Sequence, residues 1–337
     1  MAKKSDPVKE RQKRVIKTLG KKKLLDALDS MLLIRNFEVR AEAAYQMGKI
    51  GGFFHSYIGQ EAIASSIQQA IGKSSWYTTT YRCHALALIL GVTPNEIMSE
   101  LYGRANGNAK GRGGSMHLFT DNMLGGGGIV GGHVPIATGA AFASKYLKDK
   151  TKSMSTCFLG DGAVAQGAFH ESLNLASLWD LPCLYIIENN QWGMGTAVER
   201  AICVDKLAED KAPGYNMEGY TVDGMDFFAC YELFSTLTKK MKKDSRPVLV
   251  EAVTERFRGH SVSDPAHYRC KDSLAKAMEA GPIKIFKETL IKEKLLTEKQ
   301  FKDMDKKNRD LAVSSMQHAD ESPWPELDEL EEGVFSP

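Results

Sequence analysis

Two kinds of hydrophobic pattern alternate along the central part of this chain. Short apolar runs occur at residues 155–159, 182–187 and 247–253, and each has the length of a buried strand. Between the first two runs, residues 166–178 have apolar positions at helical spacing. Apolar strands separated by helices are typical of βαβ units around a buried parallel sheet. The pattern therefore predicts an α/β fold.

Both ends of the chain show helical patterns instead. Apolar residues recur at helical spacing across residues 22–47, and residues 60–70 indicate a second helix. After residue 273 the sequence is again helical in pattern and rich in charge. We therefore expect a mostly parallel sheet flanked by helices, with helical additions at about 24–70 and 273–337. All of this is expected to form a single domain over residues 24–337.

Charge is distributed unevenly along the chain. Residues 1–23 contain ten Lys or Arg against two acidic residues, while the net charge of the whole chain is only +2. We interpret residues 1–23 as a solvated basic extension before the first helix, since they lack the apolar core of a secretory signal and contain little Ser and Arg. The remainder is mildly acidic, so we expect no binding to nucleic acid.

Hydropathy and cysteine use restrict the class of protein further. No apolar run reaches the roughly 18 residues that a membrane span needs, so no membrane insertion is expected. The six cysteines are far apart and form no C-x-x-C motif. This spacing argues against a zinc ribbon or a disulfide scaffold and fits a reducing compartment. We therefore expect a cytoplasmic, bacterial protein, with the mitochondrial matrix as the less favoured location.

Polar residues follow two of the predicted strands. Asp161 lies in Gly-Asp-Gly just after residues 155–159, and Asn190 ends the Glu-Asn-Asn that follows residues 182–187. Ligands of open parallel sheets bind beyond the carboxyl ends of the strands, so these side chains are expected to lie close together. Carboxylate and amide oxygens suit a Mg²⁺ ion that is shared with phosphate groups. Two Asx turns closing ordinary loops are the alternative explanation.

Six motifs, in order along residues 30–330, extend this observation. They are GFFHSYIGQEA (52–62), TYRCHA (80–85), GRGGSMH (111–117), GGIVGGHVP (127–135), the run from GDGAVAQG (160–167) to ENNQWGMGT (188–196), and RGHSVSDPAHYR (258–269). With them the chain resembles the alpha subunits of the pyruvate dehydrogenase component of 2-oxo acid dehydrogenase complexes. The resemblance implies a thiamine diphosphate-binding fold.

The same resemblance implies a set of residues that bind thiamine diphosphate and Mg²⁺. The implied metal ligands are the side chains of Asp161 and Asn190 and the backbone carbonyl of Trp192. His260 and His55 are the implied catalytic histidines. The cofactor-binding residues that it implies besides these metal ligands are His55, Tyr81, Arg82, Gly128, Ile129, Val130, Gly162, Ala163 and His260.

Other histidines receive no active-site role in this interpretation. A histidine taken alone is more often a surface or satisfied core residue than a catalytic one. We apply that interpretation to His84, His170, His267 and His318 and expect His117 to be structural, while His133 is left without a prediction.

One residue that thiamine catalysis requires is missing from the matched motifs. A carboxylate must contact the pyrimidine ring so that the ring's amino group can deprotonate the thiazolium carbon. Glu61 is the local candidate, but we interpret it as structural. The resemblance implies that a beta subunit supplies the carboxylate, in an assembly of two alpha and two beta chains. The small residues of the predicted helix at 136–146 fit a subunit contact, with packing on the chain's own sheet as the alternative.

The expected function is oxidative decarboxylation of pyruvate with reductive acetylation of lipoyl groups on an acyltransferase partner, contributing to acetyl-CoA formation. The alternatives in the same class are dehydrogenation of acetoin or of branched-chain 2-oxo acids. A non-catalytic scaffold subunit is the alternative of a different class. A scaffold has no need for a complete magnesium–diphosphate site. The presence of the site residues therefore argues against it; these are Asp161, Asn190, Arg82 and His260.

Overall fold

A six-stranded sheet forms the centre of the protein. The computed structural model describes residues 6–148 and 153–331. Within them the strand order is β2-β1-β3-β4-β8-β7, and every neighbouring pair is parallel, which confirms the predicted fold class. The strands are β1 (Trp76–Thr80), β2 (Met123–Gly127), β3 (Ser155–Gly160), β4 (Cys183–Asn189), β7 (Glu218–Asp223) and β8 (Val248–Val253), with a separate hairpin of β5 (Trp192–Gly193) and β6 (Thr196–Ala197).

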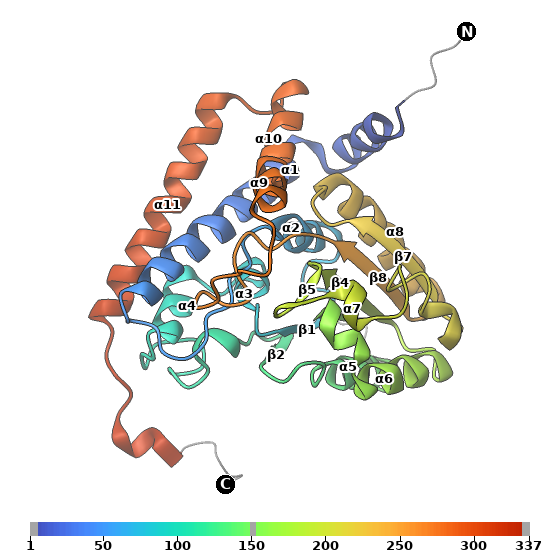
Figure 1. Cartoon of the computed structure of the whole chain (residues 1–337), viewed down its shortest axis with the longest axis horizontal. Helices are drawn as coiled ribbons and strands as arrows, with labels where there is room; N and C mark the ends of the chain where they lie inside the picture. Colours follow the sequence, from blue (N-terminus) through green and yellow to red (C-terminus); the bar gives the residue numbers. More distant parts are fainter. Residues whose placement is uncertain (1–5, 149–152, 332–337) are drawn as a thin grey trace.

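Helices cover both faces of the sheet (Figure 1). One face packs against α2, α3 and α8, and the other packs against α5 and α6. Outside the first of these helical layers, α1 and α11 lie side by side. The helices are α1 (Pro7–Gln46), α2 (Glu61–Ala70), α3 (His84–Leu90), α4 (Pro94–Leu101), α5 (Val134–Tyr146), α6 (Gly167–Leu178), α7 (Val198–Ala201), α8 (Phe227–Asp244), α9 (Lys271–Glu279), α10 (Pro282–Lys292) and α11 (Glu298–Glu321).

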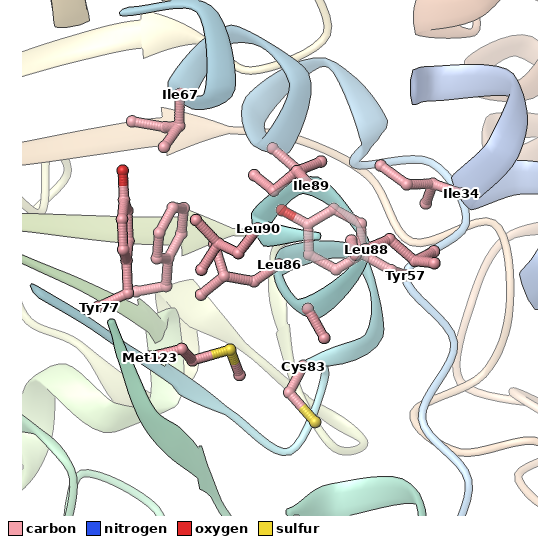
Figure 2. Close-up of a cluster of buried hydrophobic side chains, with 14 of the residues drawn as sticks. Ile34, Tyr57, Ile67, Tyr77, Cys83, Leu86, Leu88, Ile89, Leu90 and Met123 are labelled. Atoms are coloured by element: carbon pink, nitrogen blue, oxygen red, sulfur yellow. The ribbon is translucent and has the colours of Figure 1, made fainter. Parts of the chain in front are cut away.

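The apolar runs of the sequence reflect burial on both faces of the sheet. In β4, Leu184 and Ile186 belong to the core shared with α2, α3 and α8, while Tyr185 and Ile187 belong to the core shared with α5 and α6. Successive strand residues point to opposite faces, so a strand covered on both sides must be apolar throughout. Figure 2 shows part of the first core, where Ile67 of α2 lies near side chains of α3 and β1.

The N-terminal part of the first helix corrects the interpretation of residues 1–23. Helix α1 begins at Pro7, with Asp6 as its N-cap, rather than near residue 22. A break at Gly20, where φ is 71°, separates the basic first part from the rest. Val15 and Leu19 of this part are buried among aromatic residues of α8 and α10. This basic segment is therefore a short amphipathic helix with its own buried face, and its many charged residues obscured the helical pattern of its apolar positions.

No helix in the described ranges combines the length and apolarity that crossing a bilayer requires.

Candidate active site

One cavity of about 610 Å³ opens at the carboxyl ends of β1, β3 and β4. Its walls come from the loops after these strands, the glycine-rich segment after β2 and the segment after β8. This is the edge of the sheet where the strand-end argument expected a ligand. The cavity brings together all twelve of the residues predicted for the site, which are His55, Tyr81, Arg82, Gly128, Ile129, Val130, Asp161, Gly162, Ala163, Asn190, Trp192 and His260.

Asp161 and Asn190 lie at the tips of adjacent strands, as expected. Asp161 begins a short 3-10 helix, Asp161–Ala165, directly after β3, and only 3% of its surface is exposed. Burial raises the pKa of its carboxyl to about 6, against the opposing effect of the Arg256 and Arg82 charges. Asn190 donates from Nδ2 to Gln60 at 3.1 Å, while its Oδ1 is buried and has no hydrogen-bond partner among the described residues. An orphaned acceptor beside a buried carboxylate is suited to a cation.

The third predicted metal ligand, Trp192, lies in the turn after β4 and lines the cavity. The backbone carbonyl of Trp192 accepts a hydrogen bond of 2.9 Å from Arg256, which leaves one of its two lone pairs free. The hairpin of β5 and β6 fixes the position of Trp192, because Trp192 pairs with Ala197 across it. The turn after β4 therefore carries an amide oxygen and a carbonyl oxygen on two residues that line the same cavity as Asp161.

Arg82 joins two segments that are far apart in sequence. Its guanidinium donates to the carbonyl oxygens of Ser56 at 2.7 Å and His260 at 2.6 Å. The side chain is nearly buried, and desolvation lowers its pKa, although a guanidinium keeps its charge at any working pH. Arg82 thus brings a positive charge to the cavity and also fixes the positions of the segments that carry His55 and His260.

His55 and His260 form an aromatic cluster with Tyr81. The ring centroids of the two histidines are 5.1 Å apart, and the Tyr81 ring lies 4.2 Å from His55 and 5.5 Å from His260. Burial is the main cause that lowers the pKa of His55 to about 2 and that of His260 to about 4, and the Arg82 charge adds to it. Both rings are therefore neutral near pH 7.

Two charged residues of the cavity were not predicted from the sequence. Arg256 is 2% exposed and donates to the Trp192 carbonyl, to Tyr268 Oη at 3.0 Å and to His260 Nδ1 at 3.3 Å. Glu188 is also buried, accepts a short hydrogen bond from the Tyr57 hydroxyl, and has its pKa raised to about 7 by burial. Glu188 lies inside a matched motif and Arg256 lies two residues before one, but neither has a local pattern that distinguishes it from a core residue.

The residues interpreted as structural have partners elsewhere. Glu61 accepts from the backbone N–H of Gly59 and from Arg35 Nε at 2.6 Å, and it does not line the cavity. His84 is buried against the carboxylate of Glu38. His133, which had no prediction, does line the cavity, and its Nε2 lies 2.7 Å from the carbonyl oxygen of Phe158.

Comparisons with known proteins identify the family of the chain. Residues 29–328 match the family model described as the dehydrogenase E1 component. Proteins named pyruvate dehydrogenase E1 component subunit alpha are 40% identical in Rickettsia felis, over 94% of this chain and 96% of the relative, and 41% identical in Rhizobium meliloti, over 91% and 88%. The chloroplastic subunit alpha-3 of Arabidopsis thaliana is 39% identical over 94% of this chain and 76% of its own length. The chain therefore belongs to the family of dehydrogenase E1 components.

Proposed function

We propose that this chain is the alpha subunit of a pyruvate dehydrogenase, which decarboxylates pyruvate and transfers the acetyl group to lipoyl groups of an acyltransferase. The observation that carries the proposal is the cavity in which Asp161, Asn190 and the histidine pair meet at the strand tips. The names of the relatives support pyruvate over acetoin and branched-chain 2-oxo acids as the substrate.

Thiamine diphosphate is the cofactor of the E1 family, and the cavity fits its diphosphate end. When bound, it supplies a stabilised carbanion for decarboxylation. The positive charges of Arg82 and Arg256 line the same cavity as Asp161, so a phosphate group there would be balanced by guanidinium. Gly162 and Ala163 also line the cavity, and their small side chains leave the backbone open to the approach of a phosphate. Ile129, another lining residue, is 78% exposed and offers an apolar surface for a ring.

A Mg²⁺ ion would be held by Asp161, Asn190 and the carbonyl of Trp192. All three offer oxygen, which Mg²⁺ prefers and commonly shares with phosphate groups. In the described part of the chain no group of three or more His, Cys, Asp or Glu residues is placed to hold a metal. The proposed ligand set differs from such a group, because it combines one carboxylate with an amide oxygen and a backbone carbonyl. The buried Oδ1 of Asn190, which no described residue hydrogen-bonds, is the feature that supports the metal most directly.

The histidines would act as neutral groups. A guanidinium only donates, so Nδ1 of His260 is the acceptor of the contact with Arg256, and the proton of the neutral ring is on Nε2. His260 therefore has an N–H available to donate to an oxygen atom in the cavity. His55 has its Nδ1 buried without a partner among the described residues. We assign to the pair the orientation of the substrate and the movement of protons at these nitrogens.

The carboxylate that activates the pyrimidine ring is proposed to come from a beta subunit. Of the described residues that line the cavity, only Asp161 and Glu188 carry carboxylates. Asp161 is assigned to the metal. Glu188, just before the turn that follows β4, accepts a hydrogen bond from the Tyr57 hydroxyl. Glu61 lies outside the cavity. An alpha subunit of a pyruvate dehydrogenase implies a beta partner, and a second chain closing this cavity would complete the catalytic set.

An exposed face of α5 is the proposed contact between alpha chains in an assembly of two alpha and two beta chains. Ile136, Phe142 and Tyr146 project from it and are 51%, 44% and 76% exposed. Between them lies Gly139, where an added Cβ would meet no atom within 4 Å. A helix face of this kind lets another backbone approach closely, and it would cost free energy if it stayed in water.

The location is proposed to be the bacterial cytoplasm. All six cysteines, each of which lies in the described ranges, are free thiols, which suits a reducing compartment. Cell fractionation with an antibody against the chain would test this assignment, and recovery from an oxidising compartment would contradict it.

Substrate turnover by the reconstituted alpha–beta assembly tests the proposed function. We expect reductive acetylation of a lipoyl domain with pyruvate, and much slower turnover with acetoin or a branched-chain 2-oxo acid. Equal or faster turnover of acetoin would overturn the choice of substrate. If the assembly binds no thiamine diphosphate with Mg²⁺ and turns over none of the three, the scaffold alternative is correct.

A further inference from the structure

The turn that carries two of the proposed metal ligands has an unfavourable backbone shape. Directly after β4, Gln191 has a φ of 72°, in the left-handed region that a side chain with a Cβ adopts rarely. Asn190 and Trp192 lie on either side of it. Additional interactions must therefore hold this backbone conformation if both oxygens are to be ready for a cation.

Asn189 supplies part of that support. Its side-chain Oδ1 accepts the backbone N–H of Gln191 at 3.0 Å, which forms an Asx turn around the strained residue. Its backbone carbonyl accepts the N–H of Thr254 at 2.9 Å. The amide group of an Asn could also be rotated by half a turn, and its NH₂ would then face the N–H of Gln191 and the turn would lose its acceptor.

Glu251 of β8 selects the correct orientation. Its Oε1 accepts from Nδ2 of Asn189 at 2.7 Å, and both residues are buried, at 2% and 5% exposure. A carboxylate only accepts, so it requires the NH₂ end of Asn189 on its side and directs Oδ1 toward Gln191. The other oxygen of Glu251 is buried without a hydrogen-bond partner in the described ranges. A buried carboxylate is costly for stability, and such exceptions tend to mark functional sites.

We infer that Glu251 is a positioning residue for the metal: through Asn189 it holds the turn at 189–192 in the shape that presents Asn190 and Trp192 to Mg²⁺. The inference rests on the proposed function, because it assigns the metal to these two ligands. Glu251 does not line the cavity, so it acts only through the turn. Groups that orient metal ligands commonly change metal affinity about 10- to 100-fold when they are removed.

The test compares three substitutions in the reconstituted assembly with the beta chain. Glu251→Met keeps the volume but removes the acceptor, Glu251→Gln keeps an acceptor, and Leu249→Ala on the same strand is a control for general destabilisation. Titration of Mg²⁺ in the presence of thiamine diphosphate should give about tenfold or greater weakening for Glu251→Met and affinity within about threefold of wild type for the other two. Hydrogen exchange of the amides at 189–192, measured on the full chain without metal, should be faster in Glu251→Met alone.

The outcomes separate this inference from the proposed function. Magnesium affinity of Glu251→Met within twofold of wild type, or equal weakening in Leu249→Ala at a matched loss of stability, would overturn the positioning role. Asp161→Asn serves as the arm that tests the metal site itself. If Asp161→Asn loses magnesium binding while Glu251→Met keeps it, only the positioning role fails. If wild type and Asp161→Asn behave alike, the proposed metal site fails and the positioning role with it.

Discussion

Because His55 is neutral in the folded chain, the free energy of unfolding should fall as the pH is lowered. Comparing wild type with a variant that lacks this histidine should reveal that contribution. Burial holds the pKa of His55 near 2 in the folded chain, while an unfolded histidine titrates near pH 6.5. Below pH 6.5 the unfolded chain therefore binds a proton that the folded chain does not. The contribution of His55 to the free energy of unfolding is therefore fully present above pH 6.5, and it is lost progressively as the pH falls toward 2.

The size of the effect follows from the two pKa values. Between pH 6.5 and pH 4.5 the protonation of an unfolded histidine costs the folded state about 2 kcal/mol. His55→Asn removes the titration, so the wild-type free energy of unfolding should fall by about 2 kcal/mol more than that of the variant over this interval. Carboxyls with raised pKa values, such as Glu188, change stability in the opposite direction, but they are present in both proteins. Any constant packing loss in the variant also cancels, because only the change with pH is compared.

Urea denaturation of the chain at pH 6.5, 5.5 and 4.5 provides the measurement. His260→Asn should show the same trend with a smaller magnitude, because His260 keeps contact with solvent, which weakens the effect of its surroundings, while its pKa of about 4 still lies below the whole interval. If wild type and His55→Asn lose stability in parallel, the ring is not held neutral in the folded chain, and the description of the histidine pair is wrong.

Two further substitutions test the backbone and the assembly. Gly59 has a φ of 108°, and a Cβ there would overlap the carbonyl oxygen of Glu255. Gly59→Ala should therefore lower the free energy of unfolding by at least about 2 kcal/mol in urea denaturation. A loss below about 1 kcal/mol would contradict this. Gly139 lies within α5 and has open space around it, so Gly139→Ala should stabilise the isolated chain by up to about 1 kcal/mol but weaken its self-association in sedimentation experiments. Unchanged association would argue against α5 as the subunit contact.

The apolar strands were predictable because burial on both faces leaves a continuous signal. The runs at 155–159, 182–187 and 247–253 correspond to β3, β4 and β8. The other strands lack that signal. β1 is three-fifths threonine, β2 contains three glycines, and β7 is a half-exposed edge strand with polar ends. These segments form strands because they pair with strands that are distant in sequence, and a local hydrophobic pattern does not reveal such pairing.

The residues of the candidate site also differ in how far the sequence could predict them. The rule on strand ends indicates Asp161 and Asn190 from the residues alone, and the motif resemblance was needed for the other ten that line the cavity. Arg256, Glu188 and Glu251 were missed because each is a buried charge whose role depends on what the fold packs against it. Their partners come from other strands and loops, so the local sequence around each carries little information about it.

The most direct test of the account is cofactor binding by Asp161→Asn in the assembly with the beta chain. The substitution keeps the volume and removes the charge that Mg²⁺ needs. Because the carboxylate is buried and its pKa is raised, the variant without cofactor should be at least as stable as wild type. The account predicts that calorimetric titration shows magnesium-dependent binding of thiamine diphosphate to wild type and a loss of at least about 100-fold in the variant. Wild-type affinity in a stably folded Asp161→Asn assembly would contradict the claim that the strand tips of this chain hold the cofactor through a metal.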